Sequence, residues 1–588
     1  MSEKNSNIFK TLWKRQNTGE VPDWRICFAY AALIFVLCLP GIIFNDIPMR
    51  DVALRYAPMA DAFARGDFAY AFHPRIPMLF PVLSGVVSWL CGTDGFVSCK
   101  IASSLLMSLA VVPLLRVMGR LYTGKVVLTA GLLYAFTAPL LKLATEGLRD
   151  SGKLFSLMLI AEALLEIHRN RKKLYGYVIF AVAAAVAVLT RAEMLLFTGV
   201  LLAFVLKWEF AETKIPWRSL SLMGLLYIFL LPATIINGKL IGSAMPEFRF
   251  GIIFAWLLKC QPGVLDMTWV YWCGMLAMIV FVLIWRSLPR KVVIGGMIFA
   301  GVLFAAAAAV RLYYGREILT IGHIMEFFEC IFSALYPDLL FFTVLGFVLR
   351  CWQSGLEKEE KIILYLILGH AFMVTAQVIL FDGIITFTSR YLIVAAPLGY
   401  GWTALGICAF VKWLNCQRER LMPAGFTAKA FTAMVVLLAV IAAGLSYVQM
   451  TKSIYRAYFN KKQSAERQMY LDFARIIKED FKNLPKVERK APQINKFMYV
   501  AHTPLKINFL AQFKDGYLPT EASFIILAYY VNGSYDPFGD WKRGADYYVS
   551  CRQAAFPAPV LHNVRKLAEY HTRIQGVPAV YELFGDKR

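Results

Sequence analysis

Arginine beside a carboxylate recurs in nearly all of six polar turns of this 588-residue chain. The turns are residues 49–77, 145–150, 189–193, 238–250, 311–323 and 381–391. A positioned carboxylate can accept a proton from a reacting group, and guanidinium groups bind anions through directed hydrogen bonds. The same residue types also make helix caps and surface ion pairs, so the chemistry depends on where these turns lie.

The charges of the first turn have both functional and structural interpretations. Two pairs are spaced four residues apart and would share a helix face: Asp51 with Arg55, and Asp61 with Arg65. Asp51 could instead cap a helix, and the pairs could be surface salt bridges that keep a helix solvated. Asp150 could likewise cap a helix, and Arg390 with Tyr391 could anchor a span at the membrane interface. Spacing alone leaves these alternatives open.

The elements that carry these turns are membrane spans. The chain is 59% hydrophobic and 17% charged, and apolar runs of about 20 residues recur along it, which is the length of a membrane-spanning helix. The net charge of +23 lies largely beside these runs, where Lys and Arg set orientation. The sequence therefore predicts an all-α polytopic membrane protein and argues against nucleic-acid binding.

A short apolar run at residues 77–92 determines the orientation. If it lies at the interface, the basic groups at 116–125 and 169–173 fall inside, as the positive-inside rule prefers. The N-terminal segment 1–25 is then cytoplasmic, and residues 26–450 form the membrane domain with a first outward loop at 45–96. Thirteen spans are predicted, near residues 26–44, 97–116, 126–144, 151–168, 174–189, 192–207, 219–238, 268–286, 291–311, 331–350, 361–381, 391–412 and 428–450.

The tail, residues 451–588, changes composition and is predicted to be a small α/β domain outside the membrane. Residues 452–484 are typical of a charged amphipathic helix. Three segments are predicted to be strands: 496–500, 523–531 and 579–584. Residues 562–574, between the last two, are predicted to be a helix. On this topology all six polar turns face outward. Because ionised groups are costly at mid-bilayer, the turns together indicate a polar cavity that opens outward.

The first loop also resembles that of the GT-C glycosyltransferases, most closely the branch of protein O-mannosyltransferases and aminoarabinose lipid A transferases. That branch shows an acidic pair, a Tyr, then "GD", then "KPP" before an apolar segment that ends in "FG". Here Asp51 stands 15 residues before Gly66-Asp67, Arg75 and Pro77 lie at the "KPP" position, and "SWLCG" closes the segment. Further likenesses follow in the family's order: Arg149-Asp150, "LTRAE" at Arg191, and "SRYLIVAAPLGY" at Arg390-Tyr391.

Three departures accompany this resemblance. The second acid of the pair is Val52, Tyr56 is displaced by one position, and "KPP" has become "RIP". The resemblance of the motifs covers about residues 20–450. The thirteen predicted spans and the predicted outward C-terminal domain also match what the family implies.

The resemblance implies a transferase that uses a polyprenyl-phosphate-linked sugar at the outer membrane face, with Asp51 as the base and inversion at the anomeric carbon. It implies ligands for the donor phosphate, namely Arg75, Arg149, Arg191, Arg390 and, less directly, Arg55. It implies further residues of the substrate cavity, namely Asp150, Tyr56, Tyr391, Glu146 and His73. Asp150 would orient an arginine, contact the acceptor or help to hold a metal.

No cofactor is required by these residues, although the resemblance leaves open a divalent metal ion held by Asp51 and Asp150. The partners it implies are the lipid-linked donor, the bilayer and a lipid, glycan or protein acceptor, in the inner or cell membrane of a bacterium. A transporter or flippase for a lipid-linked or anionic solute is the main alternative. It would also need charges within the membrane, but the sequence has no pair of Gly/Pro-broken helices in matching halves.

Overall fold

In the computed structural model, the described part of the chain is mostly helical, with strands only in the last hundred residues. It includes nearly all of residues 51–237, which carry the first loop and the helices after it. The described residues are 22–45, 49, 51–72, 76–191, 193–213, 215–237, 289, 292, 295, 337–353, 355–377, 389–421, 430, 437, 461–483, 506–509, 534–536, 547–551, 564–574 and 577–586.

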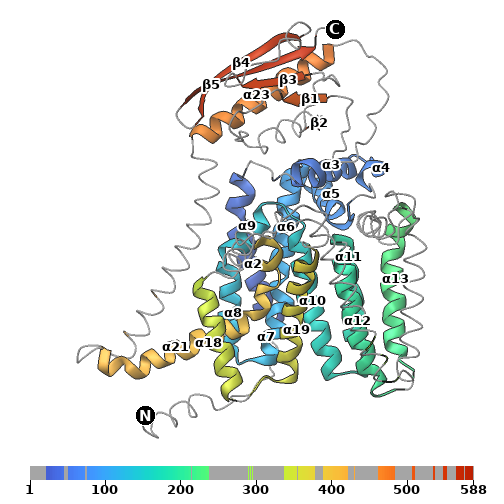
Figure 1. Cartoon of the computed structure of the whole chain (residues 1–588), viewed down its shortest axis with the longest axis vertical. Helices are drawn as coiled ribbons and strands as arrows, with labels where there is room; N and C mark the ends of the chain where they lie inside the picture. Colours follow the sequence, from blue (N-terminus) through green and yellow to red (C-terminus); the bar gives the residue numbers. More distant parts are fainter. Residues whose placement is uncertain are drawn as a thin grey trace.

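A bundle of long apolar helices forms the body of the molecule (Figure 1). Its members are α2 (Trp24–Phe44), α6 (Gly95–Leu109), α7 (Val111–Leu121), α8 (Gly124–Phe136), α9 (Ala138–Thr145), α10 (Asp150–Arg169), α11 (Leu174–Thr190), α12 (Met194–Phe210), α13 (Trp217–Asn237), α18 (Pro337–Gln353), α19 (Lys358–Gln377), α20 (Ser389–Ile393), η4 (Ala396–Gly399) and α21 (Tyr400–Leu421). These helices lie at ten of the thirteen predicted spans. The span at 268–286 and all but isolated residues of the spans at 291–311 and 428–450 lie outside the described residues, so the total of thirteen stays a prediction.

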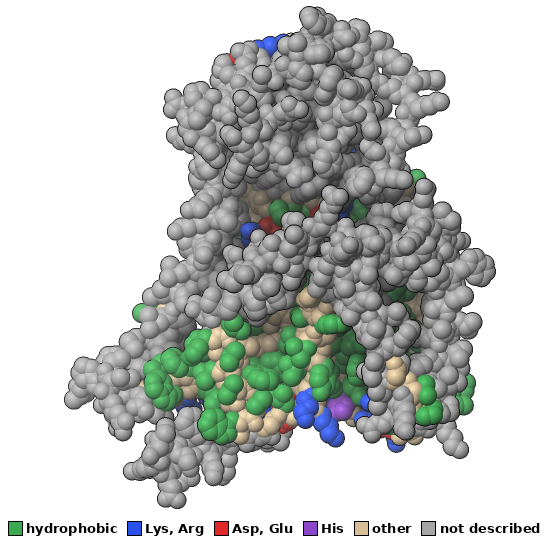
Figure 2. Space-filling view, in the orientation of Figure 1, with side chains coloured by type: hydrophobic (Ala, Val, Ile, Leu, Met, Phe, Trp, Pro, Cys, Tyr) green, Lys and Arg blue, Asp and Glu red, His purple; other side chains and the backbone are tan. Residues whose placement is uncertain are grey.

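Three of the described helices are long and apolar enough to cross a membrane, or four if α8 and α9, which bend by 50° at Thr137, count as one span. Large apolar side chains such as Leu128, Leu132, Phe341 and Val344 are exposed on the outside of the bundle. Figure 2 shows a band of apolar side chains across the lower half of the molecule, with basic side chains below it. This distribution suits a bundle surrounded by lipid, and the chain is an integral membrane protein.

The first loop forms short helices at one end of the bundle (Figure 1). They are the π-helix η1 (Val52–Tyr56), α3 (Ala57–Ala64), α4 (Phe68–Ala71) and α5 (Leu79–Cys91). The 13-residue α5 packs against α3 and α6, where Gly85 lets its backbone approach the Phe63 ring. A 13-residue helix is too short to span, because a span needs about 20 residues. The position of α5 is therefore consistent with the predicted interfacial segment at 77–92.

Buried ion pairs join the helices at the other end of the bundle. Arg350 Nε donates to both carboxylate oxygens of Glu360 at 3.0 Å, and Tyr122 donates to the same carboxylate. Arg116 and Arg120 both pair with Glu162 of α10. Since each charge has an opposite partner here, we interpret this end as structural.

The last part of the chain forms a mixed sheet that α23 (Lys461–Asn483) covers, on the same side of the bundle as α3 to α5 in Figure 1. Its strand order is β2 (Ser534–Asp536), β1 (Lys506–Phe509), β3 (Tyr547–Cys551), β5 (Val577–Asp586) and β4 (Val564–Ile574). β1 is parallel to β2 and β3, whereas β5 is antiparallel to β3 and β4. The predicted helix at 452–484 and strand at 579–584 correspond to α23 and β5. The predicted strands at 496–500 and 523–531 lie outside the described residues.

The helix predicted at residues 562–574 is wrong, because these residues form β4. β4 pairs with β5 from Val564 opposite Asp586 to Ile574 opposite Val577, with one register shift between Lys566 and Ala568. Only two residues, Gln575 and Gly576, separate the strands, and a two-residue connection with Gly is a hairpin signal. Tyr570, Thr572 and Ile574 also alternate and favour strands, and this signal outweighs the helical spacing of the apolar residues.

Candidate active site

Asp51 lies immediately before a π-helical turn. The Ala57 N–H donates to the Val52 carbonyl, five residues back, which is the bond that defines a π turn. Within the described structure the Asp51 side chain makes no capping hydrogen bond. The alternative that Asp51 serves as a helix cap is therefore wrong. Single π turns are rare in proteins, and those that occur are frequently found at functional sites.

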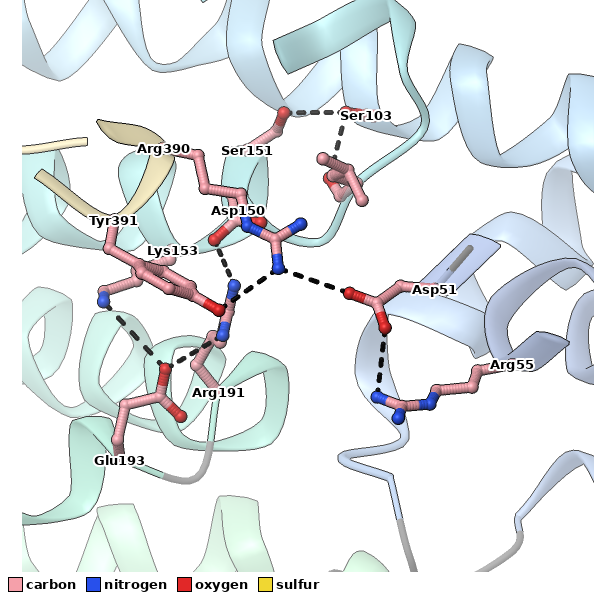
Figure 3. A network of polar contacts seen from close by, with 11 residues as sticks. Asp51, Arg55, Ser103, Asp150, Ser151, Lys153, Arg191, Glu193, Arg390 and Tyr391 are labelled. Carbon is pink, nitrogen blue, oxygen red and sulfur yellow. Dashed lines mark hydrogen bonds and ion pairs between the residues drawn. The ribbon is translucent and has the colours of Figure 1, made fainter. Parts of the chain in front are cut away.

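The Asp51 carboxylate lies between two arginines (Figure 3). Its Oδ1 is 3.2 Å from Arg55 Nη1, and its Oδ2 is 3.4 Å from Arg390 Nη2. Arg390 belongs to α20, 339 residues further along the chain, so this contact joins the first loop to the last described outward turn. Burial alone would raise the pKa of Asp51, but the nearby guanidinium groups, Arg55 and Arg390 first, outweigh it and lower that pKa. Asp51 is thus held as a carboxylate.

A second buried carboxylate, Asp150, holds Arg191. Asp150 is the first residue of α10, Arg191 follows the end of α11, and both are buried. Arg191 Nη2 donates to Asp150 Oδ1, and Arg191 Nη1 donates to Glu193 Oε1 at 3.2 Å. Two carboxylates therefore fix the guanidinium plane, which agrees with one of the roles expected for Asp150. The N-cap position of α10 is occupied by Arg149, and the side-chain hydrogen bond recorded for Asp150 in the described chain comes from Arg191.

Two tyrosines place arginines by their ring faces. The guanidinium carbons of Arg191 and Arg390 lie 5.3 Å and 5.0 Å from the Tyr391 ring centroid, and Arg390 Nη2 donates to the Tyr391 hydroxyl at 3.1 Å. The Arg149 guanidinium lies 5.6 Å from the centroid of the buried Tyr56 ring. Tyr391 therefore does more than anchor a span at the interface, because it lies between two cations of the site.

Glu146 lies beside this network, in the turn before α10. Its Oε1 is 3.8 Å from Lys142 Nζ. Burial raises the pKa of Glu146, while the charges of Lys142 and Arg390 act in the opposite direction. The structure thus brings together the predicted residues Asp51, Arg55, Tyr56, Arg149, Asp150, Arg191, Arg390, Tyr391 and Glu146. His73 and Arg75 lie outside the described residues, and their predicted roles stay predictions.

Two charged residues of the site were not predicted, namely Lys153 and Glu193. Lys153 is one turn into α10, and its Nζ is 4.0 Å from Glu193 Oε1. Lys153 falls inside the predicted span at 151–168, where an ionisable residue is itself a signal of a functional site. Glu193 ends the "LTRAE" turn two residues after Arg191, so the arginine–carboxylate pairing was visible in the sequence, whereas the contact of Glu193 with Lys153 comes from the fold.

Four buried N–H groups around Asp150 have no hydrogen-bond partner among the described residues. They are Nε of Arg149, Nζ of Lys153, Nε of Arg191 and Nε of Arg390. Arg149 also forms no ion pair with any described carboxylate, and its ring contact with Tyr56 is its nearest recorded partner. Since buried donors are normally satisfied, these groups suggest that the site takes an acceptor-rich anion.

The arrangement does not fit a metal ion held by Asp51 and Asp150. The residues that the structure describes include no group of three His, Cys, Asp or Glu side chains that could hold one. Both oxygens of Asp51 and Oδ1 of Asp150 already face guanidinium groups. A divalent cation would have to displace these arginines and would be repelled by their positive charge.

Asp61 and Arg65 do not form the predicted surface ion pair in the described structure. Asp61 Oδ1 instead accepts a 2.6 Å hydrogen bond from the Gly95 N–H, which ties α3 to the start of α6. Arg65 is exposed. This pair lies apart from the Asp51 network and has a structural role.

Asp61 is expected to make stability depend on pH. Burial raises the pKa of the Asp61 carboxyl to about 6, although the Gly95 N–H opposes the shift. An unfolded Asp titrates near about 3.9, so the native state takes up an extra proton below about pH 6, and stability falls as pH rises through this range. Asp61→Asn, which stays neutral, should have a higher Tm than wild type at about pH 7.5, and this difference should shrink by about pH 5. Thermal unfolding in detergent measures both values, and an equal difference at the two pH values would contradict the assignment.

Solved structures of other proteins resemble this fold. It is similar to the archaeal oligosaccharyltransferase AglB from Archaeoglobus fulgidus in complex with an inhibitory peptide and a dolichol-phosphate, with a TM-score of 0.51 at 12% identity over 90% of this chain and 70% of AglB. ArnT from Cupriavidus metallidurans bound to undecaprenyl phosphate matches with a TM-score of 0.49 at 10% identity, over 94% of this chain and 97% of ArnT. No protein-family model and no curated protein sequence matches the chain. The likeness to AglB shows a GT-C membrane fold.

Proposed function

We propose that this protein transfers a sugar from a polyprenyl-phosphate carrier to a hydroxyl or amine of a lipid, glycan or protein acceptor, with Asp51 as the general base. AglB, which shares the fold, was solved with a dolichol-phosphate, a ligand of the proposed class. The observation that carries the proposal is an ionised carboxylate in a network where cationic groups outnumber carboxylates, with Lys153 and Arg191 buried. Five cationic groups, Arg55, Arg149, Lys153, Arg191 and Arg390, accompany four carboxylates, those of Asp51, Glu146, Asp150 and Glu193. Figure 3 draws all of them except Arg149 and Glu146.

A phosphate group fits this excess of charge. Arg149 is free of any described carboxylate, and Arg191 is fixed in orientation while its Nε stays unpaired among the described residues. Guanidinium groups bind phosphate oxygens through short, charge-assisted hydrogen bonds. Because these donors are in place before the reaction, they would stabilise the charge that the phosphate gains as it leaves. A hydrolase would instead need two carboxylates that flank one glycosidic bond.

In the proposed reaction the acceptor oxygen or nitrogen forms a bond to the anomeric carbon of the sugar. The bond from that carbon to the phosphate oxygen breaks, and its electron pair leaves with the polyprenyl phosphate. Asp51 takes the proton of the acceptor group. A single displacement of this kind inverts the anomeric centre, and no covalent glycosyl–enzyme intermediate forms.

Asp51 must first be released from Arg390, since both its oxygens are engaged with arginines. A donor phosphate would compete for Arg390 and leave Oδ2 open to the acceptor proton. We therefore expect the donor to bind before the acceptor. In initial-rate kinetics an unreactive acceptor analogue should inhibit uncompetitively against the donor, whereas a noncompetitive pattern would show random binding.

The transfer itself is tested by incubating the purified protein with labelled polyprenyl-phosphate sugars and candidate acceptors. Formation of a new glycosidic bond with inverted configuration, together with free polyprenyl phosphate, is the expected result. Label that crosses a vesicle bilayer still attached to its carrier would favour the flippase instead.

We also propose that the end of the bundle with α3 to α5 faces out of the cytoplasm and that residues 451–588 form an outward domain. Two exposed cysteines lie at opposite ends, Cys91 at the end of α5 and Cys351 near the end of α18. A membrane-impermeant maleimide applied to intact cells should modify Cys91, and Cys351 only after permeabilisation. Peptide mass spectrometry identifies the labelled residue, and the reverse order would overturn the proposed orientation.

A further inference from the structure

Buried polar groups continue into the bundle on the side of Arg191 away from Asp51, where Figure 3 shows Lys153 and Glu193. The Lys153 side chain is buried, and its Nζ has no hydrogen-bond partner in the described part of the chain. Its nearest recorded contact is the 4.0 Å ion pair with Glu193 Oε1. In the proposed reaction Asp51 takes the proton, and Arg149 and Arg390 contact the phosphate. Lys153 and Glu193 have no direct role in either step.

His370 lies beside them on a third helix. α19 packs against both α10 and α12, and His370 is completely buried. The charges of Lys153, Glu193 and Arg191 act on the imidazole, and the Phe197 ring of α12 packs edge-on against it at 6.1 Å. Neither ring nitrogen has a hydrogen-bond partner among the described residues. Because buried polar groups are normally hydrogen-bonded, both ring nitrogens are available to a polar group that enters the site.

We propose, on the basis of the transferase function proposed above, that Lys153, Glu193 and His370 form a subsite that binds hydroxyl groups of the donor sugar. The lysine supplies N–H donors, an imidazole with one protonated nitrogen supplies one donor and one acceptor, and the glutamate supplies an acceptor. A hydroxyl is both donor and acceptor, so a sugar ring matches this mixture. An anionic substituent would suit Lys153 but would be repelled by Glu193.

The position of Lys153 relative to Arg149 agrees with a sugar ring between them. The two residues are four apart at the start of α10, so they lie on one side of the helix about one turn, or about 5 Å, apart. Both side chains therefore start from the same side of α10, so a phosphate at Arg149 and a hydroxyl of the attached sugar at Lys153 would lie along one face of this helix. The subsite would therefore select the sugar, while the arginines bind the phosphate that every such donor shares.

The test compares the donor with its monodeoxy analogues, each lacking one sugar hydroxyl. Wild type should lose about 100-fold or more in kcat/KM with at least one analogue, because buried polar groups are then left unpaired. His370→Phe keeps the ring shape and removes both nitrogens. It should lower kcat/KM about 100-fold for the full donor but less than about 3-fold for that analogue. Lys153→Met should likewise lower kcat/KM for the full donor but hardly for the analogue that lacks the same or a neighbouring hydroxyl.

His168 provides the matched control, since it lies at the other end of the bundle with its ring 5.4 Å from Trp208, and His168→Phe should leave the donor preference unchanged. His370→Gln retains a donor and an acceptor and should restore part of the preference if His370→Phe folds poorly. Equal losses for the full donor and all analogues, or a wild type indifferent to every hydroxyl, would overturn the subsite while transfer itself stands. A wild type that transfers none of a broad panel of donors would overturn the proposed function instead.

Discussion

Asp51→Asn is expected to lower the rate of sugar transfer by about 100- to 10,000-fold, the usual contribution of a general base. The amide has nearly the shape of the carboxylate, but it cannot accept the acceptor proton at neutral pH. Donor binding should change far less, because the phosphate contacts assigned to Arg149 and Arg191 remain. Single-turnover rates with saturating donor separate the two effects. In wild type, the lowered pKa of Asp51 in the free enzyme should keep kcat/KM from falling until pH drops below the usual carboxyl value of about 3.9.

The control for this variant is Asp61→Asn, which removes the same charge from the same loop. Asp61 bonds the Gly95 N–H and lies outside the Asp51 network, so transfer should stay within a few-fold of wild type. Unchanged transfer by Asp51→Asn, or an equal loss in both variants, would contradict the assignment of Asp51 as the base.

Arg149→Gln is expected to lower kcat/KM for the donor by about 100- to 1,000-fold, the effect of removing one preorganised donor from a developing anion. Arg149 is the best test of the phosphate site because it forms no ion pair with a described carboxylate. Replacing Arg149 therefore does not leave any carboxylate recorded as its ion-pair partner buried without a counter-charge. Steady-state kinetics with the labelled donor, together with binding of polyprenyl phosphate alone, measure the loss.

Arg171→Gln is the matched control for Arg149. Arg171 lies at the other end of the bundle and pairs with Glu212 at 3.0 Å in a partly exposed salt bridge. Exposed pairs contribute little to stability, so both transfer and Tm should stay near wild type. Full phosphate affinity in Arg149→Gln would place the donor elsewhere.

Those residues of the site that lie in polar turns between apolar runs could be predicted from the sequence. Asp51, Arg149, Arg191 and Arg390 were expected on one side of the membrane, and the fold brings them together. Their partners were not predictable, because the contact of Asp51 with Arg390 depends on how helices far apart in sequence pack. Lys153 was overlooked because an apolar span surrounded it, although its charge there was itself a signal.

Secondary structure followed the sequence where hydrophobic length determines it. The helices match apolar runs because lipid requires every backbone group to be bonded within the helix. Outside the membrane that requirement disappears, and residues 564–574 form a strand through pairing with β5. Strand formation here depends on a partner, so local spacing was a poor guide.

The π turn after Asp51 also determines the direction in which Tyr56 points. A π turn holds more residues than an α-helical turn, so Asp51 and Tyr56, five residues apart, return to nearly the same side of the helix. From there the Asp51 carboxylate meets Arg390 and the Tyr56 ring meets the Arg149 guanidinium. Deleting one residue inside the turn would restore α-helical geometry and should rotate one of these two side chains out of the site.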